Sequence, residues 1–132
     1  MHSNEAYLGP RRVLIVEDNP DSRASLDFLL ERLGHQVETA ATGPEGIRLG
    51  VSHRPDVAVI DLGLPGCDGF RVARSLRAAA GASITLIAYT AQDESDTRAQ
   101  AQAAGFDDYL VKPRDLVGLL RRFPAIVFAL QT

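Results

Sequence analysis

The sequence is poor in the residues that mark several classes of protein. It has one cysteine, Cys67, and no tryptophan among 132 residues. A single cysteine excludes an intrachain disulfide and a cysteine-based metal cluster, which favours a reducing, cytoplasmic setting. No stretch approaches the roughly 18 apolar residues of a membrane span, and the first residues lack the apolar run of a signal peptide. We therefore expect a soluble chain without a membrane partner.

The sequence also lacks a strong excess of charge of one sign. Its 14 basic and 17 acidic residues give a formal net charge of −3. No basic patch is dense enough to neutralise a row of phosphates, so direct binding of nucleic acid is not predicted. The composition is 45% hydrophobic without an internal repeat, which is typical of one globular domain. We expect a lead-in over residues 1–10 and a single domain over residues 11–132.

Short apolar runs alternate with segments that carry helix signals. Strands are predicted over residues 13–16, 36–40, 57–60, 84–88 and 109–111. Asn19 and Pro20 are typical of the start of a first helix, which ends at Gly34. Further helices are predicted to open at Thr42, to contain Phe70, Ala73 and Leu76, to span residues 94–104, and to begin at Leu116. The last helix should end near Phe123, because Pro124 removes a backbone donor.

Five strands alternating with five helices predict an α/β fold, in which a parallel sheet carries helices on both faces. In such sheets the functional site lies beyond the carboxyl ends of the strands. The polar residues at those ends are Glu17, Asp18, Asp61, Thr90 and Lys112. We expect these side chains to form one site.

The residue types at these strand ends favour phosphoryl chemistry. Carboxylates from separate strands repel one another, and a hard divalent cation with oxygen ligands removes that repulsion, so Mg²⁺ (or Mn²⁺) is the expected cofactor. Asp61 is placed to attack phosphorus as a nucleophile. Lys112 can pair with a phosphoryl oxygen, and the Thr90 hydroxyl can donate to another.

The same residues carry a resemblance to a known family. The motifs are Glu17-Asp18, Asp61 followed by Pro65 and Asp68-Gly69, Thr90-Ala91, and the run DDYLVKP over residues 107–113. Each motif is common, but their order and spacing over residues 11–122 resemble a response-regulator receiver domain. The resemblance implies a doubly wound (βα)5, flavodoxin-like three-layer sandwich whose five parallel strands follow the order 2-1-3-4-5.

The resemblance also implies a role for each residue of the site. Asp61 matches the phosphoacceptor, Glu17 and Asp18 the acidic metal pocket, Gly63 the residue whose carbonyl binds the metal, Thr90 and Lys112 the phosphoryl-sensing pair, and Tyr109 the aromatic switch, whose ring is expected to turn inward. A histidine kinase or histidine phosphotransfer protein would donate the phosphoryl group. The output face would comprise the fourth helix, fifth strand and fifth helix. The implied function is a signalling module that is not an enzyme in its own right.

Three other functions fit parts of the sequence. A flavodoxin-like electron carrier needs hydroxyls and free amides after the first strand, where this chain is acidic. A phosphatase of the haloacid-dehalogenase type needs a second carboxylate two residues after Asp61, where the chain has Gly63. A pseudo-receiver that acts by protein contact without phosphorylation is the main alternative. The sequence does not distinguish a stand-alone regulator from part of a hybrid kinase.

Several remaining features have ordinary explanations. His35 and His53 lie in connections and are expected at the surface. Cys67 has no evident activating base and is expected to be inert. The apolar segment after Pro124 is expected to pack back on the domain or to meet a partner, and a weak homodimer through it is one hypothesis.

Overall fold

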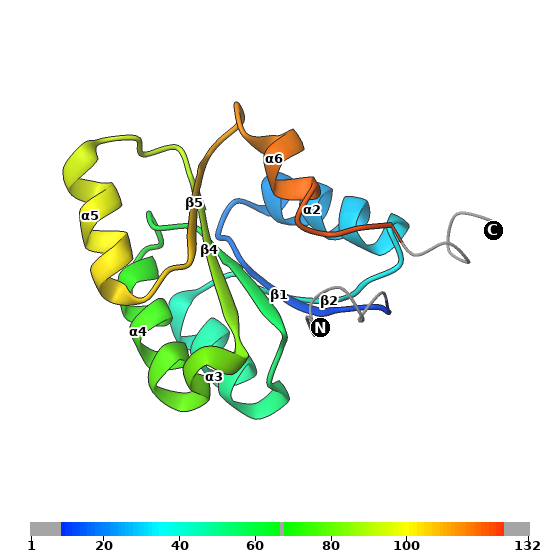
Figure 1. Cartoon of the computed structure of the whole chain (residues 1–132), viewed down its shortest axis with the longest axis horizontal. Coiled ribbons are helices and arrows are strands. Elements are labelled where there is room, and N and C mark those ends of the chain that lie inside the picture. Colours follow the sequence, from blue (N-terminus) through cyan, green and yellow to red (C-terminus); the bar gives the residue numbers. More distant parts are fainter. Residues whose placement is uncertain (1–8, 67, 126–132) are drawn as a thin grey trace, which may run out of the picture.

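The computed structural model describes residues 9–66 and 68–125 and arranges them in three layers (Figure 1). The strands of the central sheet are β1 (Arg12–Val16), β2 (Gln36–Ala40), β3 (Val57–Ile60), β4 (Thr85–Thr90) and β5 (Asp108–Val111). The helices are α2 (Pro20–Arg32), α3 (Gly43–His53), α4 (Gly69–Ala80), α5 (Ser95–Ala104) and α6 (Leu116–Leu120), with a 3-10 turn at Gly81–Ser83.

The strand order is β2-β1-β3-β4-β5, and every pair is parallel, which confirms the predicted doubly wound α/β sandwich. β1 pairs with both β2 and β3, so Val16 aligns with Ala40 on one side and with Ile60 on the other. Because these residues share a register, Glu17 and Asp61 leave the sheet beside each other. The direction of winding also changes at β1, which is where such folds place their sites.

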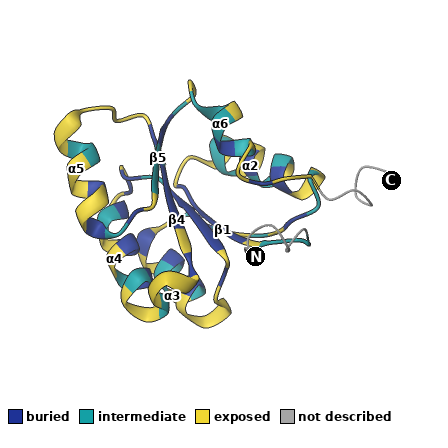
Figure 2. Cartoon of the chain, in the orientation of Figure 1, coloured by how far each residue is buried: buried dark blue, intermediate teal, exposed yellow. Residues whose placement is uncertain are grey.

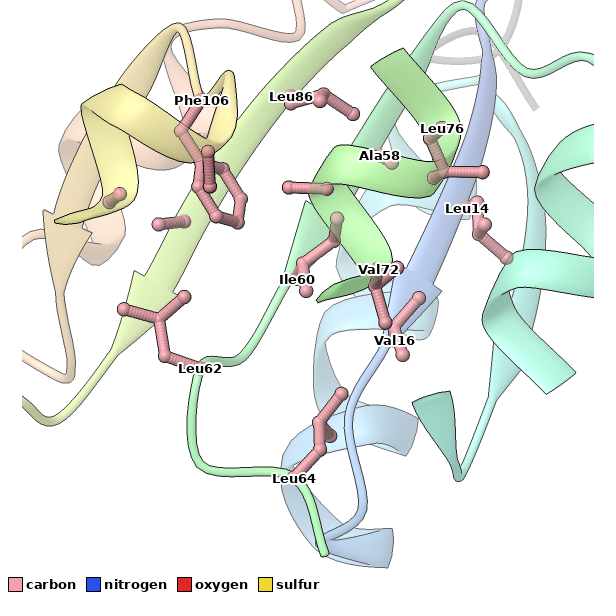
Figure 3. Packing of buried hydrophobic residues seen from close by; sticks show 14 of the residues in the cluster. Leu14, Val16, Ala58, Ile60, Leu62, Leu64, Val72, Leu76, Leu86 and Phe106 are labelled. Atoms are coloured by element: carbon pink, nitrogen blue, oxygen red, sulfur yellow. The ribbon is translucent and has the colours of Figure 1, made fainter. Parts of the chain in front are cut away.

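Alternate side chains of the strands separate into two hydrophobic cores. Successive residues of a strand point to opposite faces, and in β1 Val13 and Ile15 pack beneath α2 and α6, while Leu14 and Val16 pack on the opposite face. That second core includes residues of α4 and α5 (Figure 3). β3 is buried along its whole length, as predicted for a strand covered on both faces. Buried residues gather in the central strands, and many exposed residues lie on the outer sides of the helices (Figure 2).

Side-chain caps fix where three helices begin. Asn19 Oδ1 accepts a hydrogen bond from the Ser22 amide at 3.0 Å, and Thr42 Oγ1 accepts one from the Glu45 amide at 3.3 Å. Both caps agree with the predicted helix starts. Asp68 caps α4 in the same way, through the amide of Arg71 at 2.9 Å. Each cap satisfies an amide that has no partner within the helix.

Several element boundaries differ from the sequence prediction, and the ends of β4 and α6 are two of them. β4 runs to Thr90 instead of stopping at residue 88, because its ladder continues until Thr90 aligns with Val111. Thr90 is therefore the last residue of a strand. α6 ends at Leu120, before Phe123, because the chain tightens there into bonds between residues three apart, such as Phe123 N to Leu120 O at 3.0 Å.

The expectation of a surface position for His35 is wrong, since this residue is only 5% exposed. Its Nδ1 accepts a hydrogen bond from the Arg11 amide at 3.0 Å, and its Nε2 lies 2.9 Å from the Pro124 carbonyl. Nδ1 can accept only when it is unprotonated, so the neutral ring carries its proton on Nε2 and donates it to Pro124. The edge of the Phe123 ring completes the contact, with 5.7 Å between ring centroids. His53 is exposed and pairs with Glu38.

Burial lowers the pKa of His35 below its ordinary value of 6.5, and the nearby charge of Arg11 acts in the same direction. As pH falls through about 6.5, the unfolded chain binds a proton on His35, whereas the folded chain binds that proton only at a lower pH. The stability that His35 contributes is therefore complete above pH 6.5 and decreases as the pH falls toward the folded-state pKa. The His35→Leu variant is expected to be less stable than wild type by about 1–3 kcal/mol at pH 7.5, because the Arg11 amide loses its acceptor.

Urea unfolding at pH 7.5 and pH 5.5 measures this contribution. The stability difference between wild type and His35→Leu should shrink at the lower pH. His53→Leu is the matched control, because it removes an exposed histidine, and its effect should stay within about 0.5 kcal/mol. An equal wild-type-to-His35→Leu difference at both pH values would show that the pKa of His35 is not lowered.

Two expectations concern residues outside the described part of the chain. They are the inert Cys67 and the apolar segment after Pro124, of which only Ala125 is described. Within the described part, none of the helices has the length and hydropathy that a membrane crossing requires.

Candidate functional site

Four polar side chains leave the sheet at neighbouring strand ends. Glu17, Asp61 and Lys112 each directly follow a strand, and Thr90 is the last residue of β4. The ladder hydrogen bonds continue one residue past the strands, from Glu17 N to Ala40 O at 3.0 Å, from Asp61 N to Val16 O at 3.0 Å and from Lys112 N to Thr90 O at 2.8 Å. The sheet therefore fixes the backbone from which these side chains project.

The structure brings the three predicted acidic residues together. Glu17, Asp18 and Asp61 each present one oxygen, and the three oxygens lie within 4.8 Å of one another. Glu17 is 6% exposed, and the Asp61 side chain is 14% exposed. Asp18 is open to solvent. The cluster is thus buried on the side of Glu17 and Asp61 and open to solvent on the side of Asp18, from which a ligand can approach.

Lys112 supplies the positive charge of the cluster. Its Nζ donates to a Glu17 carboxylate oxygen, and it lies 3.3 Å from Asp61 Oδ2. The lysine side chain is 19% exposed, and it belongs to the only lysine in the sequence. The peptide bond between Lys112 and Pro113 is cis.

Burial and charge act against each other on the pKa values of this pair. Desolvation raises the pKa of Glu17 and outweighs its hydrogen bonds to Lys112 and to the Asn19 amide. Desolvation alone would lower the pKa of Lys112, but the Glu17 hydrogen bond and the Asp61 charge outweigh it and raise that pKa. The lysine is therefore fully protonated at neutral pH, with two carboxylates as partners.

Local hydrogen bonds orient the acidic residues, and sequence reasoning missed most of them. The Asn19 amide donates to Glu17 Oε2 at 3.0 Å, and the Gly63 amide donates to Asp61 Oδ1 at 3.2 Å. Arg23, from the first turns of α2, donates to the backbone carbonyls of Glu17 at 2.9 Å and Asp18 at 3.3 Å. The position of Arg23, five residues after Asp18 on a helix that starts at the site, could have predicted this contact from the sequence.

Thr90 and Tyr109 meet at one loop residue, Gln92. Thr90 is 1% exposed, and its Oγ1 accepts a hydrogen bond from the Gln92 amide at 3.4 Å. The Tyr109 hydroxyl donates to the Gln92 carbonyl at 2.6 Å, while its half-buried ring packs against the core beneath α4 and α5. The loop between β4 and α5 therefore contacts both residues.

The donor set of this site fits a hard divalent cation. Three carboxylates and one ammonium leave an excess of negative charge, and all the acidic ligands offer oxygen, which Mg²⁺ prefers. Asp61 has one oxygen facing the Gly63 amide and the other facing Lys112. A tetrahedral anion bound there would find the Lys112 ammonium and the Gly63 amide nearby.

Comparison with known proteins gives a consistent result. A family model for the response regulator receiver domain matches residues 13–123. The protein PilH of Pseudomonas aeruginosa is 36% identical over 117 residues, which cover 88% of this chain and 97% of PilH. The transcriptional regulatory protein PrrA of Mycobacterium tuberculosis is 39% identical over 116 residues. That alignment covers 88% of this chain but 49% of PrrA, so the chain spans about half the length of that relative.

Solved structures agree with the fold and include one with a metal. A CheY-like receiver domain from Methanospirillum hungatei superposes with a TM-score of 0.78 and 27% identity, covering 86% of this chain and 93% of its own. The receiver domain of the sensor histidine kinase PA1611 from Pseudomonas aeruginosa has a TM-score of 0.75 and 33% identity, covering 87% and 98%. The latter structure holds a magnesium ion in its active site cleft.

The family model covers most of the chain, the relatives align over nearly all of it, and the sheet has the strand order of their fold. The chain therefore belongs to the response regulator receiver domains of two-component signalling systems.

Proposed function

We propose that the chain accepts a phosphoryl group on Asp61 with Mg²⁺ bound and, once phosphorylated, changes its affinity for a downstream protein. The observation that supports this most directly is that the Asp61 carboxylate lies 3.3 Å from the Lys112 ammonium and close to the carboxylates of Glu17 and Asp18. Such a site matches the needs of phosphoryl transfer, where positioning and electrostatic stabilisation supply most of the rate enhancement.

The proposed metal ligands are Glu17, Asp18, Asp61 and the backbone carbonyl of Gly63. The first three are supported by the proximity of their oxygens, and the magnesium in the similar PA1611 structure supports the choice of ion. Mn²⁺ has the same preference for oxygen ligands and is expected to substitute. When bound, the ion offsets the negative charge of the attacking carboxylate and of the phosphoryl oxygens.

The protein residues have separate roles in the proposed transfer. An Asp61 oxygen forms the new bond to phosphorus while the bond from phosphorus to the donor histidine nitrogen breaks, and the imidazole leaves. Lys112 pairs with a phosphoryl oxygen, and the Thr90 hydroxyl donates to another. As Thr90 moves toward the phosphoryl group, the Gln92 loop moves with it, and Tyr109 follows through its bond to Gln92.

The proposed donor is a histidine kinase or a histidine phosphotransfer protein, and the proposed output face comprises α5, β5 and α6. Tyr109 lies on this face, because it belongs to β5. The cytoplasmic setting, the weak homodimer and the domain limits of residues 11–132 stay predictions. A pseudo-receiver without phosphorylation is the alternative, and the complete acidic cluster with its lysine favours phosphorylation.

Intact-protein mass spectrometry after incubation with acetyl phosphate tests the proposal. Wild type is expected to gain one phosphoryl adduct in the presence of Mg²⁺, and Asp61→Asn is expected to gain none, because an amide is a far weaker nucleophile than a carboxylate. Asp96→Asn is the matched control, since it removes an exposed carboxylate from α5 and should behave as wild type.

Two further outcomes are informative. Loss of the wild-type adduct on addition of a chelator would confirm the need for metal. No adduct on wild type, with acetyl phosphate and with a phosphorylated histidine donor alike, would contradict phosphorylation and support the pseudo-receiver.

A further inference from the structure

The Tyr109 side chain is held at two places. Its hydroxyl bonds to the Gln92 carbonyl at 2.6 Å, and the guanidinium carbon of Arg98 lies 4.6 Å from the centre of its ring. An arginine at that distance over a tyrosine face is attracted by the electrons of the ring. The hydrogen bond fixes the tip of the phenol, and the arginine restricts its face.

Arg98 is itself oriented by Asp93. Both Nε and Nη2 of Arg98 donate to Asp93 Oδ1, at 3.1 and 2.6 Å. The second oxygen of Asp93 accepts from Arg114 Nη1 at 3.3 Å. The hydrogen bond from Arg98 lowers the pKa of Asp93, so the carboxylate stays ionised at neutral pH. Exposed ion pairs are weak one at a time, but here one carboxylate joins three segments of the chain.

These contacts lie on the loop that follows Thr90. Asp93 and Gln92 are neighbours in that loop, Arg98 stands in the first turn of α5, and Arg114 follows the segment that carries Lys112. The Gln92 side chain also borders the acceptor, because its Nε2 is 3.6 Å from where a side chain on Gly63 would begin. A change in the position of Tyr109 would therefore affect the loop after Thr90 and the segment that carries Lys112, the two segments proposed to contact the phosphoryl group.

We propose that Arg98, oriented by Asp93, is a positioning residue that holds the Tyr109 phenol on the Gln92 carbonyl. This inference rests on the proposed function in one respect, namely that the held arrangement is the one that phosphorylation favours. Holding Tyr109 there before phosphorylation raises the fraction of molecules that are ready to accept the phosphoryl group. Because coupling is reciprocal, phosphorylation must favour the held position of Tyr109 by the same factor.

Fluorine NMR on the unphosphorylated chain tests the positioning directly. The sequence has three tyrosines, so 3-fluorotyrosine labelling gives three resonances, and Tyr109→Phe identifies the one of interest. In Arg98→Met and in Asp93→Asn this resonance is expected to move toward its position in the urea-unfolded chain, while Arg98→Lys gives a smaller change. Arg122→Met is the matched control, because it also removes an arginine that pairs with an aspartate, in this case Asp108.

The resonance of Tyr89 shows in each variant whether the fold is intact. An unchanged Tyr109 resonance in folded Arg98→Met and Asp93→Asn would overturn the proposal, whatever the phosphorylation result.

The second measurement concerns phosphorylation. The acetyl phosphate concentration that gives half-maximal adduct with Mg²⁺ is expected to rise roughly fivefold in Arg98→Met, as the loss of one cation–π contact predicts, and to stay unchanged in Arg122→Met. An unchanged value in Arg98→Met would overturn the link to phosphorylation. If wild type takes no phosphoryl group at all, the proposed function fails, and the NMR result still decides whether Arg98 positions Tyr109.

Discussion

The Gly69→Ala variant is expected to lose about 3 kcal/mol of unfolding free energy. A Cβ atom at position 69 would lie 2.4 Å from the Asp61 carbonyl oxygen and 2.8 Å from Leu62 Cα. Both atoms belong to the backbone, so no side-chain rotation relieves the clash. The Gly69 amide also donates to the Leu62 carbonyl at 3.3 Å, which ties the start of α4 to the loop after Asp61. Either α4 or the Asp61 backbone must move.

Urea unfolding monitored by circular dichroism measures this loss. Gly118→Ala is the matched control, because it is also a helical glycine, but its new Cβ would meet only the end of the Arg122 side chain at 3.8 Å. That variant is expected to gain about 0.5–1 kcal/mol from helix propensity. If both variants changed stability in the same direction, the close backbone contact at Gly69 would not explain a requirement for glycine at that position.

The Lys112→Met variant is expected to form the phosphoryl adduct about 100-fold more slowly than wild type. Removal of one preorganised charge or donor aimed at developing negative charge commonly reduces the rate 10²–10³-fold. Methionine keeps the length and apolar stem of lysine, so the main loss is the ammonium that Glu17 and Asp61 now share. Without it the three carboxylates also repel one another more strongly.

The rate of adduct formation with acetyl phosphate and Mg²⁺, followed by intact mass, checks this prediction. Arg121→Met is the control for loss of one positive charge, because Arg121 is exposed on the segment after α6. Its rate should equal that of wild type. Comparable slowing in both variants would point to net charge and not to the position of the ammonium.

The sequence was sufficient to predict the sheet and the ends of most of its strands, that of β4 excepted. A continuous apolar run such as residues 57–60 has few alternatives to a strand covered on both faces, and the acidic or basic residue that ends each run must lie where the sheet meets solvent. Parallel strands bring those ends to one edge, so the meeting of Glu17, Asp18, Asp61 and Lys112 followed from chain direction alone.

The long-range hydrogen bonds were not predictable in the same way. His35 is buried because it satisfies the Arg11 amide, 24 residues away, and the Pro124 carbonyl, 89 residues away. No local sequence pattern predicts hydrogen-bond partners so far away in the chain, and a lone histidine in a connection is normally at the surface. The contacts of Arg98 also depend on how a loop turns after Thr90, which spacing does not determine.

The acidic cluster has a consequence for the balance between stability and ligand affinity. Three carboxylates whose oxygens lie within 4.8 Å, with one ammonium among them, make the ligand-free fold less stable than its core alone would allow. A divalent cation that binds there relieves this repulsion. Part of its binding free energy would therefore come from removing an electrostatic repulsion that is already present in the folded, ligand-free protein. Neutral substitutions in the cluster are then expected to yield a more stable protein with a lower affinity for a divalent cation, which is the usual trade-off between stability and activity.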